Sequence, residues 1–345
     1  MLNSVEVRNF GPLREVKWAI LGRINLVIGS NGSGKTFFLK GLYSAMRTLE
    51  EYKRGNDGRT VPEILADKLR WTFQVERIGD LVTRGADARL RFELFLNEKQ
   101  FSFSFGKEST KRISTIENYV PPPRNDNSIF LPAKEVLSVH GIILKSRDQD
   151  RLFGFDDTYL DLARALRIPT TQGRNYPAFA KSRERLRGMI GGFVRYDEEA
   201  NQWYFRSSSG HVFNMGVTAE GTKKIAILDT LLGNRHLSPG SFVFIDEPEA
   251  AMHPAMISEL LDIVTNLAEA GIQFFMATHS YFVINKLFLI AQKRKWSIPV
   301  LSSQFSTGDG SLADAWRCDD LLDGMPDNPI IDESIRMYEN EWDVR

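Results

Sequence analysis

Residues Gly29–Thr36 have the sequence GSNGSGKT and decide the fold, because they match the pattern G-x-x-x-x-G-K-[ST] in full. An apolar run, Ile24–Ile28, precedes them, and a helix-compatible run begins at Lys35. Strand, glycine-rich loop and helix in this order form a cradle, in which backbone N–H groups and the positive end of the helix dipole face an anion. A chance glycine-rich turn would lack this context. The stretch therefore predicts a phosphate-binding loop in an α/β sheet.

The same loop predicts a nucleoside triphosphate and its metal ion as ligands, here ATP and Mg²⁺. We expect Lys35 to reach the β- and γ-phosphates and to take part in catalysis, and Thr36 to hold Mg²⁺ through its hydroxyl. The other nucleotide contacts are expected from the rest of the loop, namely Gly29, Asn31, Gly32, Ser33 and Gly34.

A second apolar strand ends in two acidic residues. The run Phe242–Ile245 is followed by Asp246 and Glu247 in FVFIDEPEAAMHP. Beside a phosphate-binding loop, Asp246 would hold Mg²⁺ through water, and Glu247 would orient or deprotonate the attacking water. Alone, the pair is equally typical of a helix-capping acid with an acidic neighbour on the surface. Next to the complete loop, the metal-site interpretation is favoured.

His279 ends a further apolar strand, FFMATHS. A lone histidine is more often structural than catalytic. At the carboxyl end of a strand, however, it would share one rim of the sheet with Gly29 and Asp246. There it could hydrogen-bond the γ-phosphate, so we favour a catalytic role.

Between the loop and the acidic strand lies NMGVTAEGTKKIAIL, Asn214–Leu228. Gly221 leads a predicted helix, and a glycine at a helix start exposes backbone N–H groups to an anion. Since the chain's own loop already cradles its phosphates, Glu220 and Gly221 suggest a phosphate supplied by another copy. The predicted helix has one apolar face and a glycine as its C-cap: Ile225, Leu228, Leu231, Leu232 and Gly233.

The bulk composition excludes several classes of protein. Its 44 basic and 44 acidic residues cancel, so no global field favours nucleic acid or membrane. The single cysteine, Cys318, excludes an internal disulfide and suits a reducing compartment. The N-terminus lacks a signal-peptide pattern, and the longest apolar stretch, SYFVINKLFLIAQ, is too short for a bilayer and contains Lys286. We expect a cytoplasmic protein with no membrane partner.

Two further stretches have competing interpretations. Alternation over 68–105, in LRWTFQVERIG, ARLRFELFLNE and QFSFSFG, predicts an antiparallel sheet. Its FSFSF segment is more typical of the buried face of a meander than of a base-stacking platform. The cluster KSRERLRG, Lys181–Gly188, is more typical of a solvated helix face. It leaves contact with nucleic acid or an acidic partner open.

The order of these motifs resembles the ABC-type ATPases, and more narrowly the soluble branch that contains RecF, SMC heads and OLD-family ATPases. The segments VRNFGPLREVKW and INLVIGSNGSGKT match the opening of that branch, and DEPEAAMHP matches its D-loop. The resemblance covers Met1 to about Leu289. It implies an α/β fold, an ABC-type ATPase head with a mixed central sheet, an antiparallel β lobe and an inserted helical lobe. Its expected parts are an ATPase head, 1–290, and a C-terminal capping tail, 291–345. Within this arrangement we expect a β insertion at 48–128 and a helical lobe at 135–190. The C-terminal half, 192–345, would carry the signature and the acidic strand, which is called Walker B in this family.

The resemblance also implies a homodimer around two ATP molecules, with a higher oligomer left open. Each ATP would be held by Lys35 and Thr36 of one copy and by the Gly221 loop of the other. Ala251 and His253 would lie in the D-loop near the dimer interface.

Two departures from the family pattern favour slow ATP hydrolysis. Ala219 replaces the signature serine, and FLPAKEVLS lacks the glutamine of the lobe-linking loop, which leaves Lys134 or Glu135 as substitutes.

Stand-alone heads of this branch resemble the ATPase components of bacterial anti-phage systems (Septu, PARIS and certain retron systems). This resemblance implies a sensor or scaffold that controls a separately encoded effector, a nuclease or toxin. A RecF- or SMC-like DNA-binding ATPase in DNA repair is one alternative, and a transporter ATPase subunit is a second. A small-molecule kinase would leave Gly221 and His279 unexplained.

Overall fold

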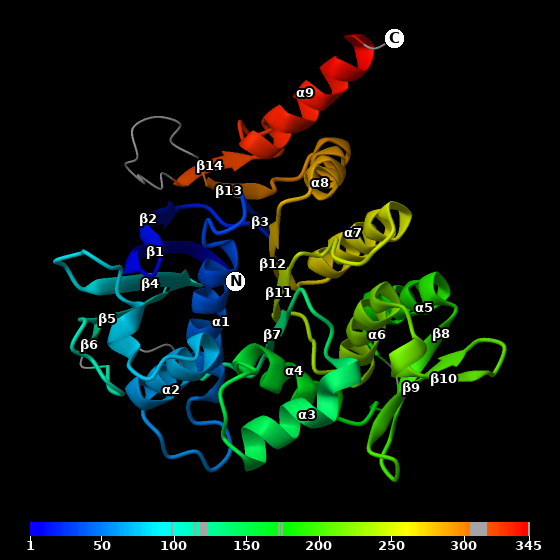
Figure 1. The fold of residues 1–345 in the computed structure, drawn as a ribbon, viewed down its shortest axis with the longest axis horizontal. Helices are drawn as coiled ribbons and strands as arrows, with labels where there is room; N and C mark the ends of the chain where they lie inside the picture. Colours follow the sequence, from blue (N-terminus) through cyan, green and yellow to red (C-terminus); the bar gives the residue numbers. More distant parts are fainter. Residues whose placement is uncertain are drawn as a thin grey trace. The chain divides into compact units, whose positions relative to one another are not determined.

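The computed structural model describes residues 1–97, 99–113, 115–117, 123–171, 173, 175–303 and 316–343. The chain divides into two compact units, unit 1 with residues 1–124 and 275–345, and unit 2 with residues 125–274. The boundary falls inside one strand, β12 (Gln273–Thr278). Figure 1 labels the helices and strands of both units.

Unit 1 contains an antiparallel sheet in the order β2-β1-β4-β5-β6. Its N-terminal strands pair with the strands of the predicted β insertion, because β1 pairs with both β2 and β4. Phe101, Phe103 and Phe105 of β5 are buried, which confirms the buried-face interpretation of FSFSF. The strands are β1 (Leu2–Phe10), β2 (Leu13–Trp18), β4 (Leu90–Leu96), β5 (Lys99–Phe105) and β6 (Thr115–Glu117).

A helix, α2 (Val61–Phe73), occupies the first part of the stretch in which alternation predicted a strand. That prediction was wrong. The sequence TVPE starts the helix with a capping box, in which Thr60 N–H donates to Glu63 Oε2 over 2.8 Å. Pro62 fits the first turn, where no helical N–H partner is needed. Helix α1 (Lys35–Glu51), α2 and the antiparallel sheet share an aromatic core, which includes Phe10 and Phe73 at 5.4 Å between ring centroids.

The phosphate-loop strand β3 (Ile24–Ile28) belongs to a second sheet and is buried along its whole length. Strand β13 (Pro299–Ser303) pairs with β3 in parallel, and β14 (Trp316–Asp320) pairs with β13 antiparallel. Residues 299–303 of the predicted tail are therefore part of the sheet that carries the loop. Residues 304–315 and 344–345 of that tail lie outside the described residues.

The remaining elements of unit 1 are η1 (Ile78–Leu81), α8 (Tyr281–Arg294) and α9 (Pro329–Asp343). Among the helices of the described residues, in either unit, none has the length and apolar character needed to cross a bilayer.

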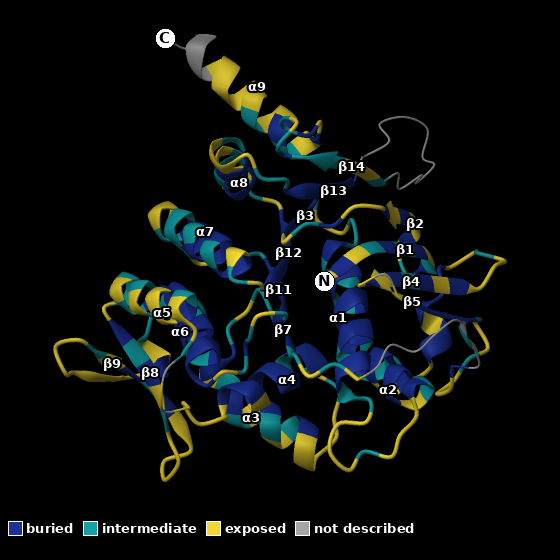
Figure 2. Ribbon diagram, turned by 180° about the vertical axis from the view of Figure 1, so that it is seen from behind, coloured by how far each residue is buried: buried dark blue, intermediate teal, exposed yellow. Residues whose placement is uncertain are grey.

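Unit 2 pairs β7 (Ser128–Leu131) with β11 (Phe242–Asp246) in parallel and adds the sheet β10-β9-β8. Helix α5 (Pro177–Ile190) packs against both α6 (Glu220–Gly233) and α7 (Pro254–Glu269). Figure 2 shows that the inner faces of these helices are buried. The other elements are η2 (Leu137–Val139), α3 (His140–Leu144), η3 (Lys145–Gln149), α4 (Asp157–Leu166), β8 (Gly192–Asp197), β9 (Gln202–Ser207), β10 (Val212–Asn214) and η4 (Met215–Val217).

Candidate nucleotide-binding site

The loop between β3 and α1 has backbone geometry that requires glycine at two points. Gly29 has φ +155°, and a Cβ there would lie 2.1 Å from Ser303 Oγ. Gly34 has φ +94° and precedes the first residue of α1, with Pro12 and Leu13 packed against its Cα. At Gly32, a Cβ would meet no atom of the described residues within 4 Å. The loop is thus held tightly at both ends and open at its middle.

Polar groups of this loop fit a phosphate ligand. The Lys35 ammonium donates to the carbonyl oxygens of Gly29 and Ser30 over 2.8 Å and 2.7 Å, so its charge lies inside the curve of the loop. The hydroxyls of Ser30 and Ser33 are buried and have no hydrogen-bond partner among the described residues. Buried polar groups without partners are rare in native proteins. A phosphate in the loop would supply acceptors for both hydroxyls and a counter-charge for Lys35.

His279 directly follows β12, as predicted, and its side chain is exposed. Strands β3 and β12 are neighbours in the sheet that carries the loop. His279 and the phosphate loop therefore belong to the same unit, whereas Glu220, Gly221, Asp246 and Glu247 belong to unit 2.

The acidic pair of unit 2 follows a buried strand. Asp246 is the last residue of β11 and is 9% exposed. Glu247 has φ +48°, a left-handed conformation that is uncommon outside glycine. The Glu247 carbonyl accepts hydrogen bonds from Ala250 N–H at 3.0 Å and from Lys224 Nζ at 3.3 Å. Both hydrogen bonds fix the backbone at the acidic pair.

Gly221 is buried against the D-loop of its own unit. A Cβ on Gly221 would lie 2.8 Å from the carbonyl oxygen of Ala251, which itself has φ +62°. The glycine is therefore needed for close packing. Helix α6 begins at Glu220, and Ala219 is its N-cap without a side-chain cap. His253 is the N-cap of the next helix, α7, where its Nδ1 accepts a hydrogen bond from Ala255 N–H at 3.2 Å.

The predicted apolar face of α6 is confirmed, since Ile225, Leu228, Leu231 and Leu232 are buried. The predicted C-cap is wrong: Gly233 is the last helical residue, and Asn234 is the C-cap. Gly233 instead makes room for the guanidinium of Arg183, which would lie 2.5 Å from an added Cβ.

Glu135, a candidate for the missing glutamine, is tied to α6. Its carboxylate accepts from Lys223 Nζ at 3.4 Å and from Ser138 N–H at 3.0 Å, and Lys223 Nζ also donates to Glu220 at 2.7 Å. A small cavity of about 40 Å³ joins this region to the acidic pair. Its charged lining residues are Lys134, Glu135, Lys224, Asp246 and Glu247.

Burial of Lys224 lowers the pKa of its ammonium, an effect that Glu247 opposes most strongly among the nearby acids. Sequence reasoning missed Lys223 and Lys224. Their signal was visible in EGTKK, because Glu220 and Lys223 are three residues apart on one helix.

The basic cluster Lys181–Gly188 is largely used inside the protein. Arg183 and Arg187 each form an ion pair of 2.9 Å with Asp229 of α6, whose side chain is 4% exposed. Arg185 pairs with Glu259 of α7 at 3.6 Å. Three of its four cations therefore join α5 to its neighbours.

Fold and site together define a P-loop ATPase of the ABC type. The chain belongs to the family described as "AAA domain, putative AbiEii toxin, Type IV TA system", whose model matches residues 24–285. A search of curated proteins finds no significant match.

Solved structures of SMC heads share the fold. The head bound to the C-winged-helix domain of ScpA has a TM-score of 0.53 at 13% identity, covering 92% of this chain and 97% of that chain. An SMC head with an extended coiled coil, bound to the C-terminal domain of ScpA derived from Pyrococcus furiosus, has a TM-score of 0.50 at 11% identity. The coverage is 98% of both chains. At these identities the likeness shows the fold alone.

Proposed function

We propose that this chain binds ATP and Mg²⁺, dimerises around two ATP molecules and hydrolyses them slowly. The observation that carries the proposal is the contact between Gly221 and the carbonyl of Ala251. A P-loop protein that acts alone has no need of a glycine-led helix packed on the segment after its acidic strand. A protein that binds a second copy's nucleotide at the N-terminus of α6 does need contact between this helix and the segment after the acidic strand.

In this mechanism, each loop residue keeps the role predicted from its motif. Lys35 binds the β- and γ-phosphates, while Thr36 and Asp246 are the residues that would hold Mg²⁺, which would offset the negative charge of the phosphates. Glu247 accepts a proton from water as the water oxygen attacks the γ-phosphorus, the bond to the ADP oxygen breaks and phosphate leaves. His279 hydrogen-bonds the γ-phosphate and distinguishes ATP from ADP.

Contacts within unit 2 connect α6, which we call the signature helix, to Glu247. Helix α6 reaches the Glu247 carbonyl through Lys224 and the Ala251 carbonyl through Gly221. An anion bound at the start of α6 would pull on both contacts, and the left-handed backbone of Glu247 and Ala251 would respond. ATP held by one copy would in this way set the catalytic geometry of the other.

The dimer is tested by light scattering with ATP. Glu247→Gln should bind ATP without cleaving it and accumulate as a dimer, because the proton acceptor is lost and the nucleotide contacts are kept. Lys35→Ala is the matched control and should stay monomeric without bound nucleotide. A Glu247→Gln protein that binds ATP and remains monomeric contradicts the sandwich mechanism.

Slow turnover follows from Ala219 at the N-cap of α6, which offers no hydroxyl to a γ-phosphate. Phosphate release should fall far below the roughly 10 s⁻¹ that is typical of enzymes, and Ala219→Ser should accelerate it. A wild-type rate near that typical value contradicts the proposal.

We further propose that the ATP-bound dimer controls a separately encoded effector, a nuclease or toxin, in anti-phage defence. The family's description names a putative toxin and a toxin–antitoxin system, and a toxin–antitoxin system contains a second protein. A DNA-repair clamp is less favoured, because Arg183, Arg185 and Arg187 are paired within unit 2. Co-expression with the product of the adjacent gene tests the proposal: ATP should change that protein's activity. Strongly salt-dependent DNA binding by this chain alone would favour the clamp instead.

A further inference from the structure

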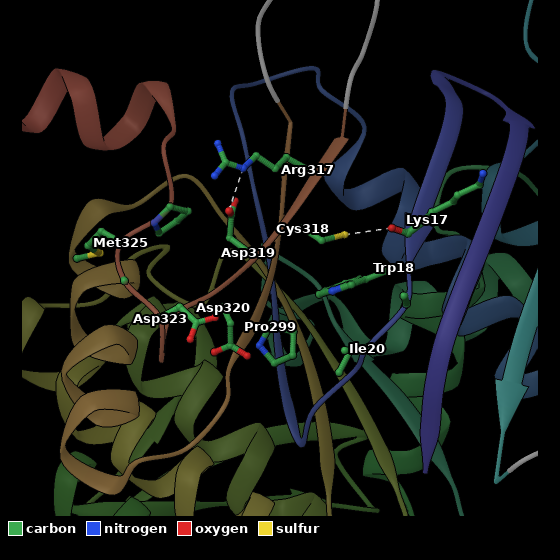
Figure 3. A pocket seen from close by; sticks show the side chains of 13 residues that line it. Lys17, Trp18, Ile20, Pro299, Arg317, Cys318, Asp319, Asp320, Asp323 and Met325 are labelled. Carbon is green, nitrogen blue, oxygen red and sulfur yellow. Dashed lines mark hydrogen bonds and ion pairs between the residues drawn. The ribbon is translucent and has the colours of Figure 1, made fainter.

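The C-terminal part of unit 1 forms a surface that the nucleotide site does not use. A cavity of about 610 Å³ lies between the end of β2, the start of β13, the strand β14 and the turn that follows it (Figure 3). Helix α9 begins a few residues after this turn. We call the cavity and α9 together the C-terminal surface.

The cavity contains a hydrogen-bond donor that lacks an acceptor. Trp18 is 1% exposed, and its indole Nε1 has no hydrogen-bond partner among the described residues. Figure 3 shows its ring reaching into the space between Cys318 and Pro299. A buried donor of this kind is unfavourable unless an oxygen is supplied. The Nε1 atom is itself closed to solvent, so this donor belongs to the wall of the cavity and not to its open surface.

The charged residues that line the cavity are Asp319, Asp320 and Asp323, with Lys17 and Arg317. Residues 316–345 contain nine acidic and three basic residues, a net charge of −6 in a chain whose total is zero. Asp320 accepts hydrogen bonds from Ile298 N–H at 3.0 Å and Leu322 N–H at 2.8 Å and so shapes the turn, whereas Asp323 is exposed at the cavity rim. The surface therefore attracts a cationic ligand.

Helix α9 adds an apolar stripe beside these charges. Ile331, Ile335 and Tyr338 are spaced four and three residues apart, which places them on one face. Ile331 is buried, but Ile335 is 49% and Tyr338 is 60% exposed. Asp332 and Glu339 flank the stripe and are exposed. Figure 2 shows this exposure along most of α9.

We propose that the C-terminal surface docks a basic amphipathic segment of a partner protein. Its apolar side covers Ile335 and Tyr338, and its cations meet the acidic residues of the turn and of α9. A second copy of this chain is a poorer occupant, because a twofold interface would face two acidic surfaces toward each other. The identification of this partner with the effector rests on the proposed function, but the docking chemistry does not.

The test uses two synthetic amphipathic helices as fluorescent probes, both with leucine at heptad a and d positions. The basic probe has lysine at its flanking positions, and the acidic probe has glutamate there. Fluorescence anisotropy should show that the full chain binds the basic probe, more weakly at high salt, and does not bind the acidic probe.

Matched variants locate the binding. Ile335→Ser should weaken binding of the basic probe by about tenfold, because the surface loses an apolar anchor. Met337→Ser is the control, since Met337 is 66% exposed on another face of α9. Its affinity should change by less than about twofold.

Three outcomes overturn the proposal. Two of them are equal binding of both probes and unchanged binding of the basic probe by Ile335→Ser. The third is self-association of the wild type that Ile335→Ser abolishes, because it would assign the apolar stripe to a second copy. The basic probe should bind Lys35→Ala protein as tightly as the wild type. Failure of the ATP-dependent dimer and failure of this docking surface are thus separate results.

Discussion

The phosphate loop and the signature helix both depend on glycine, for different physical reasons. Gly29 and Gly34 adopt φ values of +155° and +94°, and Lys35 of the same short segment closes the loop by donating to its carbonyls. Gly221 instead allows a carbonyl thirty residues away to approach. The first site is built from its own local sequence, whereas the second is built from distant contacts. The predictions below test this difference.

The largest effect is expected at Gly29. Gly29→Ala should abolish detectable ATP binding and destabilise the fold by roughly 3 kcal/mol, because a Cβ would strain the backbone and meet Ser303. Isothermal titration calorimetry with ATP and urea unfolding measure the two effects.

Gly32→Ala is the matched control, because its φ is also positive, +80°, but a Cβ there meets no atom of the described residues within 4 Å. It should destabilise by only about 1 kcal/mol. Equal loss at both positions would mean that contact with Ser303 is irrelevant.

This difference explains what the sequence could predict. GSNGSGKT carries its geometry in adjacent residues, so the strand, loop and start of α1 were predictable. The capping box of α2 is equally local, and TVPE is its signal, but the alternation that follows Thr60 and Glu63 in the sequence favours a strand over the same residues. By contrast, no local pattern could link Gly221 to Ala251, or Arg183 and its neighbours to Asp229. Those contacts exist only after α5, α6 and the D-loop have packed.

The next largest effect is expected from the distant contacts that hold the signature helix. Asp229→Ala should destabilise unit 2 by about 3 kcal/mol, because it leaves Arg183 and Arg187 without their shared, largely buried carboxylate. ATP affinity of the loop, measured by calorimetry on folded protein, should be retained.

The control for this prediction is Glu184→Ala on the same helix, where the side chain is exposed. Its unfolding free energy should change by less than about 0.5 kcal/mol. If Asp229→Ala is equally mild, the arginines are a solvated face after all and become available to nucleic acid.

A smaller effect is expected at Gly221. Gly221→Ala should lower the free energy of unfolding by about 1–2 kcal/mol. The added Cβ would lie only 2.8 Å from the Ala251 carbonyl oxygen, so that carbonyl would have to move. ATP affinity should persist, and the ATP-dependent dimer of the Glu247→Gln background should weaken at least several-fold in light scattering.

Gly216→Ala serves as the comparison, because a Cβ there meets only Asn214 at 3.8 Å, an ordinary contact. It should leave both stability and dimer formation near those of the wild type. A Gly221→Ala protein that dimerises normally would separate the D-loop contact from the nucleotide response.

The smallest effect concerns His140, which is buried in unit 2 and bonded through Nε2 to the Ala163 carbonyl at 3.0 Å. Burial lowers its pKa from the usual 6.5, with a smaller contribution from Arg167. The unfolded chain therefore binds a proton before the folded chain does. The stability that His140 contributes is present above pH 6.5 and declines as the pH falls toward the lower folded value.

Urea unfolding at about pH 7.5 and about pH 5.5 measures this effect. Between these two pH values, the free energy of unfolding of the wild type should fall by about 1 kcal/mol more than that of His140→Phe. The substitution keeps an aromatic ring beside Tyr196 and Trp203 but removes the titrating group. Helices α3 and α4 meet through this histidine. If both proteins lose the same free energy of unfolding, the stability of unit 2 does not depend on a neutral imidazole. Its pH response then arises from carboxylates instead.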